Sequence, residues 1–265
     1  MKFWTQTCLW AGLLTLFLLS GCHMHDKTLT VAASAVPHAE ILEAAKPALE
    51  KEGIHLKIVE VDDWNLPNRL LYEKQVDANF FQHKPYLEEQ NRRFGYNLQP
   101  LVSVHIEPLG IYSKRIHSLS ELKAGSTIAI PSDPTNEARA LALLADLKVI
   151  QLKPGVNTTL ATLYDIAENP KNLKIQEIDA PFLPRTLSDV DAAVIPVNFA
   201  LQAGLNPTQD ALALEPADSP YANIVAIREG DAGREDLQKL KEALTSEEMR
   251  QFIIQKYHGA ILPAF

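Results

Sequence analysis

The chain has 265 residues, with 33 acidic and 25 basic side chains and a net charge of −8 at neutral pH. A surface of this charge repels phosphate backbones and acidic lipid headgroups, so the composition argues against nucleic acid as a partner. The length is sufficient for one large or two medium domains with proper hydrophobic cores.

The first segment of the chain has the pattern of an export signal. Lys2 is followed by an apolar stretch at positions 8–19 that carries no charge. This stretch is shorter than the roughly 20 apolar residues of a membrane helix, and it fits the roughly 7 to 15 of a signal-peptide core. We therefore expect residues 1–21 to be a signal peptide.

The signal ends in Leu19-Ser20-Gly21-Cys22, which resembles the lipobox of bacterial lipoproteins. We expect Cys22 to carry the lipid and residues 22–27 to form a tether at the cell envelope, facing the periplasm or the exterior. An ordinary signal with a chance cysteine is the alternative. With Cys8 removed and Cys22 lipidated, the remaining chain has no thiol for a disulfide or a metal site.

After the tether, strands and helices are expected to alternate. Residues 29–33 read as a strand, and residues 54–58 alternate as in a half-buried strand. Between them, Pro37 suits a first helical turn, and Gly53 suits a helix end. The apolar face of that helix is formed by Ile41, Leu42, Ala45, Ala48 and Leu49.

The same alternation continues further along the chain. We expect helices at 118–123 and 134–147 and strands at 127–130, 173–178 and 192–195. Two helices follow in the tail, the second opened by Thr245 with Glu248 three residues later, which is a capping-box pattern. This order predicts an α/β protein in which helices cover parallel sheets.

Five blocks resemble the methionine-binding lipoprotein family, also called the NlpA lipoproteins, and they occur in the family's order along the whole mature chain. The first is VDANFFQHKPYL at 76–87, which Leu66-Pro67-Asn68 precedes. The others are EPLGIYSK at 107–114, DPTNEAR at 133–139, ENPKNLKI at 168–175 and SPYAN at 219–223.

The resemblance implies a two-lobed periplasmic-binding-protein-like fold of type II, with the ligand cleft between the lobes. It places lobe 1 at 28–111 plus 200–265 and lobe 2 at 112–199. It also implies a substrate receptor, not an enzyme, that captures methionine and delivers it to the permease and ATPase of an ABC importer. The lipid would provide the contact with the membrane.

An amino acid needs donors for its carboxylate, acceptors for its ammonium and an apolar pocket for its side chain. Arg139 lies one turn after Asn136 near the start of a predicted helix, so both can face a cleft beside the positive helix end. The resemblance implies that Arg139 clamps the carboxylate. A solvated surface arginine is the alternative.

The resemblance implies that Phe81, His83 and Tyr86 line the pocket, where aromatic rings favour a thioether sulfur. Phe80 reads as core and is left out of the site, and His83 alone would read as an ordinary loop histidine. Trp64 stands where relatives often carry tyrosine, so it retains aromatic area and moves the polar tip.

Polar contacts complete the expected site. Asn198 and Asn223 carry over as contacts to the ligand backbone, because an amide offers both a donor and an acceptor. Each alone would read as a turn or cap residue. Glu107 is a candidate acceptor for the ammonium.

The remaining chemistry is sparse. The sequence has no GxSxG, GxxxxGK[ST] or HExxH signature, and we expect no cofactor and no metal. His23 and His25 read as polar spacers of the tether. The alternatives to a methionine receptor are a receptor for a methionyl dipeptide or another small amino acid, an enzyme with dispersed catalytic residues, and a surface adhesin.

Overall fold

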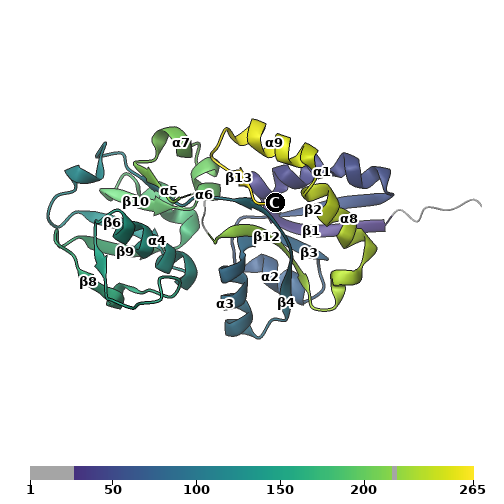
Figure 1. Ribbon diagram of the computed structural model, residues 1–265, viewed down its shortest axis with the longest axis horizontal. Helices are drawn as coiled ribbons and strands as arrows, with labels where there is room; N and C mark the ends of the chain where they lie inside the picture. Colours follow the sequence, from purple (N-terminus) through teal and green to yellow (C-terminus); the bar gives the residue numbers. More distant parts are fainter. Residues whose placement is uncertain (1–26, 217–219) are drawn as a thin grey trace, which may run out of the picture.

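The structure is a computed structural model that describes residues 27–216 and 220–265. Two lobes lie side by side, each built on its own β-sheet with helices packed against it (Figure 1). The expected signal peptide and Cys22 lie outside the described residues. Within the described ranges, no helix has the length and apolar character needed to cross a membrane.

The larger sheet has six strands in the order β13-β4-β12-β3-β1-β2. They are β1 (Lys27–Ser34), β2 (Ile54–Val61), β3 (Ala78–His83), β4 (Leu98–Ile106), β12 (Ala222–Arg228) and β13 (Leu262–Pro263). β1 is parallel to β2 and β3, whereas β12 is antiparallel to β3 and β4. The sheet is therefore mixed and not purely parallel as expected, because β12 enters directly from the other lobe and not through a crossover helix.

Alternation along β1 determines which helices cover each face of this sheet. Val31 and Ala33 pack with α1, α8 and α9, whereas Ala32 packs with α2 and α3. These helices are α1 (Glu40–Lys51), α2 (Leu66–Tyr72), α3 (Lys84–Phe94), α8 (Glu235–Leu244) and α9 (Glu247–Tyr257). A π-helical turn, η1 (Ala35–Ala39), joins β1 to α1, so the helix begins three residues after Pro37.

The second sheet has the order β11-β5-β10-β6-β9. Its strands are β5 (Gly110–Tyr112), β6 (Thr127–Pro131), β9 (Lys174–Ile178), β10 (Ala192–Ile195) and β11 (Ala213–Leu214). β6 is parallel to β9 and β10, and β5 is antiparallel to β10 and β11, so this sheet is mixed as well. The alternating strand and helix pattern at 127–147 is confirmed, because β6 is followed by α4 (Pro134–Asp146).

Short elements complete the second lobe. The helices are α5 (Leu183–Thr186), α6 (Val197–Gln202) and α7 (Pro207–Asp210), and β7 (Gln151–Leu152) pairs with β8 (Ile166–Glu168). Short 3-10 turns are η2 (Leu119–Glu121), η3 (Leu163–Asp165) and η4 (Ala180–Phe182), while η5 (Asp231–Gly233) lies in the first lobe. The helix expected at 118–123 is thus a single 3-10 turn.

The chain passes from one sheet to the other between β4 and β5 and again between β11 and β12. Both β5 and β11 belong to the second sheet, which therefore extends beyond the range 112–199 expected for lobe 2. The reason is that the chain after β10 forms α6 and α7 and then returns to pair β11 with β5 before it crosses. We call 107–109, and the described residues 215–216 and 220–221 between β11 and β12, the crossover segments.

The capping residue of the last helix differs from the prediction by one position. Ser246, and not Thr245, is extended and accepts a hydrogen bond from the backbone N–H of Met249. Thr245 instead ends α8, where its hydroxyl donates to the carbonyl oxygen of Lys241. Only Thr245 and Ser246 separate α8 from α9, so one residue ends the first helix and its neighbour caps the second.

Candidate ligand-binding site

One cavity between the two lobes is lined by every residue that the sequence reading placed at the site. These residues are Trp64, Phe81, His83, Tyr86, Glu107, Asn136, Arg139, Asn198 and Asn223, and Gln82, Pro196 and Val197 complete the lining. The space between these side chains, including its opening to solvent, amounts to about 370 Å³.

Aromatic side chains form one wall of the cavity. The ring centroid of Tyr86 lies 5.9 Å from those of both Trp64 and Phe81, and Phe199 approaches Trp64 at 4.9 Å. The Tyr86 hydroxyl donates a hydrogen bond to the backbone oxygen of Trp64 at 3.3 Å, which fixes the two residues relative to each other. Phe80, the neighbour of Phe81 on β3, is buried in the core of the first lobe, as the sequence indicated.

His83 joins this wall to the polar part of the cavity as a neutral imidazole. Its Nδ1 accepts the backbone N–H of Tyr86 at 3.2 Å and caps α3, so Nε2 carries the proton and donates to Oδ1 of Asn136 at 3.2 Å. Burial, with the positive charge of Arg139 as a smaller cause, lowers the pKa of His83 to about 3. The contact to Asn136 links β3 of the first lobe to α4 of the second.

Arg139 lies in the second turn of α4, whose N-cap Asp133 accepts the backbone N–H of Asn136. Its Nε donates to both carboxylate oxygens of Glu215 at 2.9 and 3.0 Å, and its Nη2 donates to Glu215 and to the backbone oxygen of Glu107. The Tyr221 ring lies 4.4 Å from Cζ. Arg139 therefore contacts both crossover segments, and Glu215 already occupies the planar fork that a ligand carboxylate was expected to use.

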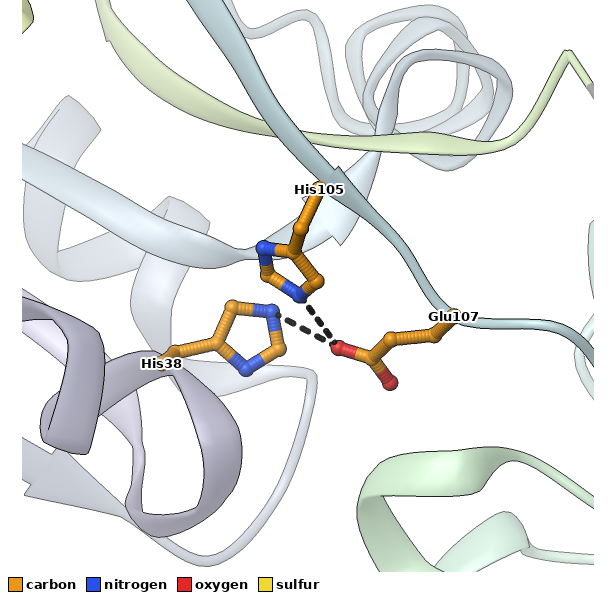
Figure 2. A group of neighbouring side chains, drawn as sticks. All are labelled: His38, His105 and Glu107. Atoms are coloured by element: carbon orange, nitrogen blue, oxygen red, sulfur yellow. Dashed lines mark hydrogen bonds and ion pairs between the residues drawn. The ribbon is translucent and has the colours of Figure 1, made fainter. Parts of the chain in front are cut away.

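Glu107 is a buried residue of the cavity wall whose carboxylate accepts two hydrogen bonds. The Nε2 of His105 donates to Oε1 at 2.8 Å, and the Nε2 of His38 lies 3.3 Å from the same oxygen (Figure 2). The backbone N–H of Asn198 donates to Oε2 at 3.1 Å. Burial raises the pKa of Glu107, opposed in part by His38, by the positive charge of Arg139 and by the hydrogen bond from Asn198. Since burial also lowers the pKa of His38 to about 4 and of His105 to about 3, both imidazoles are neutral near pH 7.

His38 also orders a second polar residue of the cavity. Its Nε2 lies 3.1 Å from Oδ1 of Asn223, and its Nδ1 lies 2.7 Å from Oγ of Ser34. Since both neighbours of Nε2 are acceptors, the proton is on Nε2 and Nδ1 accepts from Ser34. His38 thereby holds Glu107 and Asn223 in one arrangement.

Two buried donors on the cavity wall have no hydrogen-bond acceptor among the described residues. They are Nδ2 of Asn198 and Nε1 of Trp64. A buried donor without an acceptor costs about 1 to 3 kcal/mol. Both donors therefore favour a ligand that brings acceptor atoms.

His38, His105 and Glu107 are the one group among the described residues whose ligand atoms are close enough for a metal ion, all within 4.8 Å of one another. Two zinc ligands at about 2.1 Å would be about 3.4 Å apart, whereas Nε2 of His105 is 2.8 Å from Glu107. Nδ1 of His105 has no partner, which suits an unprotonated nitrogen and leaves the proton on Nε2. The geometry is that of hydrogen bonds to a carboxylate.

The sequence reading missed three residues that organise this site, His38, His105 and Glu215. His105 carries a weak signal, since it is a polar residue between Val104 and Ile106 in an apolar strand. Glu215 has no local signal, because its partner Arg139 is 76 positions away. Only the pairing of β11 with β5 brings it to the cavity.

Comparison with known proteins gives a consistent result over almost the whole chain. Residues 29–265 match the family model described as NlpA lipoprotein. The methionine-binding lipoprotein MetQ of Bacillus subtilis is 41% identical over 248 residues, covering 92% of this chain and 90% of that protein. The D-methionine-binding lipoprotein MetQ of Salmonella typhi is 41% identical over 247 residues, covering 91% of each chain.

Solved structures agree with the fold. A nutrient-binding protein from Burkholderia cenocepacia bound to methionine superimposes with a TM-score of 0.87 at 45% identity, covering 89% of this chain and all of that chain. A solved structure of the methionine-binding protein MetQ superimposes with a TM-score of 0.87 at 38% identity, covering 90% of this chain and 98% of that chain. The two-lobed, periplasmic-binding-protein-like α/β fold is thereby confirmed, and this chain belongs to the NlpA lipoprotein family.

Proposed function

We propose that this protein is a lipid-anchored, substrate-binding protein that captures methionine in the cavity between its lobes and delivers it to an ABC importer. The observation that carries the proposal is the composition of the cavity, where an aromatic wall faces a cluster of buried polar and charged groups. An amphiphilic zwitterion needs both kinds of surface in one small volume. A similar protein has a structure bound to methionine.

The aromatic wall suits the side chain of methionine. Trp64, Phe81 and Tyr86 line the cavity, and a sulfur near such rings gains about 0.3 to 1.5 kcal/mol per contact.

The polar groups suit the two charged ends of an amino acid. Glu107 and Asn223 offer acceptors for the ammonium, while Arg139 and the unpartnered Nδ2 of Asn198 offer donors for the carboxylate. Asn136 lies beside them from the second lobe. Because the donors and acceptors come from both lobes, the ligand would hold the lobes together when it binds.

Attachment and delivery complete the proposal. Lipid on Cys22 would hold the protein at the membrane, and the ligand-loaded protein would dock on the permease and ATPase complex. The lobe assignment enters here as a proposal too, with the larger sheet in lobe 1 and the smaller sheet in lobe 2. The matching family is described as NlpA lipoprotein, and a similar protein is named a methionine-binding lipoprotein. These names support attachment by a lipid and methionine as the ligand. The protein acts by binding and release, not as an enzyme.

Ligand analysis tests the proposal. The purified protein is denatured, any released small molecule is identified by mass spectrometry, and the stripped protein is titrated calorimetrically. We expect L-methionine, D-methionine or a methionyl dipeptide to bind at one site, and a hundredfold excess over Kd to stabilise the fold by about 2.7 kcal/mol. If none of these produces binding heat or a shift in melting temperature, the proposal is wrong.

A further inference from the structure

We propose that the cavity selects its ligand mainly through the α-ammonium group and only secondarily through the carboxylate. The two charged side chains on the cavity wall, Arg139 and Glu107, differ in how they are paired. Arg139 already has a carboxylate partner, whereas Glu107 is surrounded by neutral donors. The inference rests on the proposed function and names the part of the amino acid that the site requires.

The charge of Arg139 is compensated within the protein. Glu215 accepts from both Nε and Nη2, and only 4% of the Arg139 side chain and 11% of the Glu215 side chain are exposed. Glu215 is held in turn by the backbone N–H of Leu109. Among the described residues, none accepts a hydrogen bond from Nη1, so this group offers a ligand carboxylate a single contact and not a bidentate one.

Glu107 has no ion-pair partner of its own among the lysines and arginines of the described residues, because the nearby Arg139 is paired with Glu215. It accepts hydrogen bonds from the imidazole of His105 and the backbone N–H of Asn198, and the imidazole of His38 lies 3.3 Å away. These three groups are neutral, so they stabilise a carboxylate without cancelling its charge; Figure 2 shows the two imidazoles. A ligand that brings a cation supplies the missing partner in a site from which water is largely excluded.

Glu107 and Asn223 both keep acceptor capacity that a ligand ammonium can use. His105 holds Oε1 by a hydrogen bond and His38 lies beside it, whereas Oε2 retains acceptor capacity beyond its bond to Asn198. Oδ1 of Asn223, which already accepts from His38, likewise retains a lone pair. The ammonium can therefore bond to a carboxylate and an amide oxygen at once, while the ligand carboxylate must share Arg139 with Glu215.

Two analogues of methionine separate the contributions without adding bulk. Methylthiopropylamine keeps the ammonium and lacks the carboxylate, whereas methylthiobutyrate keeps the carboxylate and lacks the ammonium. Each is measured by its ability to displace bound methionine. Since removing one partner of a buried charge pair costs about 2 to 5 kcal/mol, we expect methylthiobutyrate to bind at least about 30-fold more weakly than the amine.

Two variants test the residues that carry the preference. Glu107→Gln keeps the size of the side chain and removes its charge, so the preference for the amine should fall by about tenfold or more. Glu215→Gln frees the Arg139 fork, so methylthiobutyrate should bind about tenfold more tightly than to the wild type. Glu50→Gln, at an exposed position of α1, is the matched control and should leave the ranking unchanged.

The outcomes distinguish this inference from the proposed function. If wild-type protein binds no methionine, the proposed function fails. If methionine binds but the two analogues displace it equally, or the carboxylate analogue displaces it better, the inference is overturned. An unchanged ranking in Glu107→Gln, with the variant folded by circular dichroism and still binding methionine, overturns it as well.

Discussion

Arg139 and Glu215 form a buried ion pair in which Nε and Nη2 of the guanidinium both face one carboxylate. The pair joins α4 of the second lobe to a crossover segment, and a further hydrogen bond from Nη2 to the backbone oxygen of Glu107 reaches the other crossover segment. Arg139 thus lines the cavity and also connects the two crossover segments to each other.

This double role predicts that Arg139→Ala lowers stability as well as affinity. The substitution leaves Glu215 without its partner, and we expect the free energy of unfolding to fall by about 2 to 4 kcal/mol, somewhat less than for a fully buried pair because Glu215 is partly exposed. Urea denaturation without ligand measures the loss. The double variant Arg139→Ala/Glu215→Gln should recover part of it, and an unchanged midpoint in the single variant would show that the pair contributes nothing to the fold.

The hydroxyl and the ring of Tyr86 are expected to contribute unequally to methionine affinity. Tyr86→Phe removes only the hydrogen bond to the backbone oxygen of Trp64, which is worth about 0.5 to 1.5 kcal/mol. Tyr86→Ala also removes apolar wall and should weaken methionine binding by about 1 to 3 kcal/mol. Calorimetric affinities of both variants check this order, and an equal loss in both would assign the effect to the hydroxyl.

Acid should destabilise the protein through His83. Its pKa is about 3 in the folded protein and near 6.5 when unfolded, so the unfolded state takes up a proton first as the pH falls. The neutral His83 imidazole therefore contributes fully to the free energy of unfolding above about pH 6.5, and this contribution is lost progressively as the pH falls toward 3. Chemical denaturation at a series of pH values measures the slope.

His83→Asn is the matched variant for this effect. Asparagine also caps helices well but does not titrate, so the slope between pH 7 and pH 5 should become smaller while the cap of α3 is kept. An identical slope in the two proteins would mean that other groups, such as His38 and His105, account for the acid sensitivity.

Methionine affinity should fall as the pH is lowered, because burial raises the pKa of Glu107 and the ligand ammonium binds its ionised form. Linkage to one proton limits the slope to about tenfold per pH unit. Binding should release protons in the pH range where Glu107 titrates, which calorimetry detects by comparing buffers of different ionisation enthalpy. Glu107→Gln should abolish the release, and a release that survives in this variant would point to another group.

Attachment to the membrane should depend on Cys22. Cys22→Ala removes the expected lipid acceptor, so the protein should become soluble or accumulate in unprocessed form. Membrane fractionation and intact mass measure this. A variant that still fractionates with membranes at the mass of the lipidated protein would show that the lipid is attached elsewhere.

Local patterns were sufficient for the elements with a clear hydrophobic period, whereas others, such as β3, α3, β4 and β12, were not predicted. The strand at 127–130, the helix at 134–147 and the strand at 192–195 agree with β6, α4 and β10 within one residue, because hydrophobic periodicity and the Asp133-Pro134 start are local signals. The predicted strands pair in parallel, β1 with β2 and β6 with β9 and β10, whereas the strands that make both sheets mixed were not predicted. Direction depends on where the chain crosses between lobes, and periodicity carries no information about that.

The sequence by itself determined the α/β class, the export signal as a prediction, and the residue types of the cavity, because these depend on local pattern and on motifs that resemble a family. Tertiary structure decided how the charges are paired. Glu215 reaches Arg139 only through the pairing of β11 with β5, and His38 and His105 meet at Glu107 only because η1 and β4 pack together with it. Such pairings join residues far apart in the chain, and the stability or charge of each group depends on partners that no local pattern specifies.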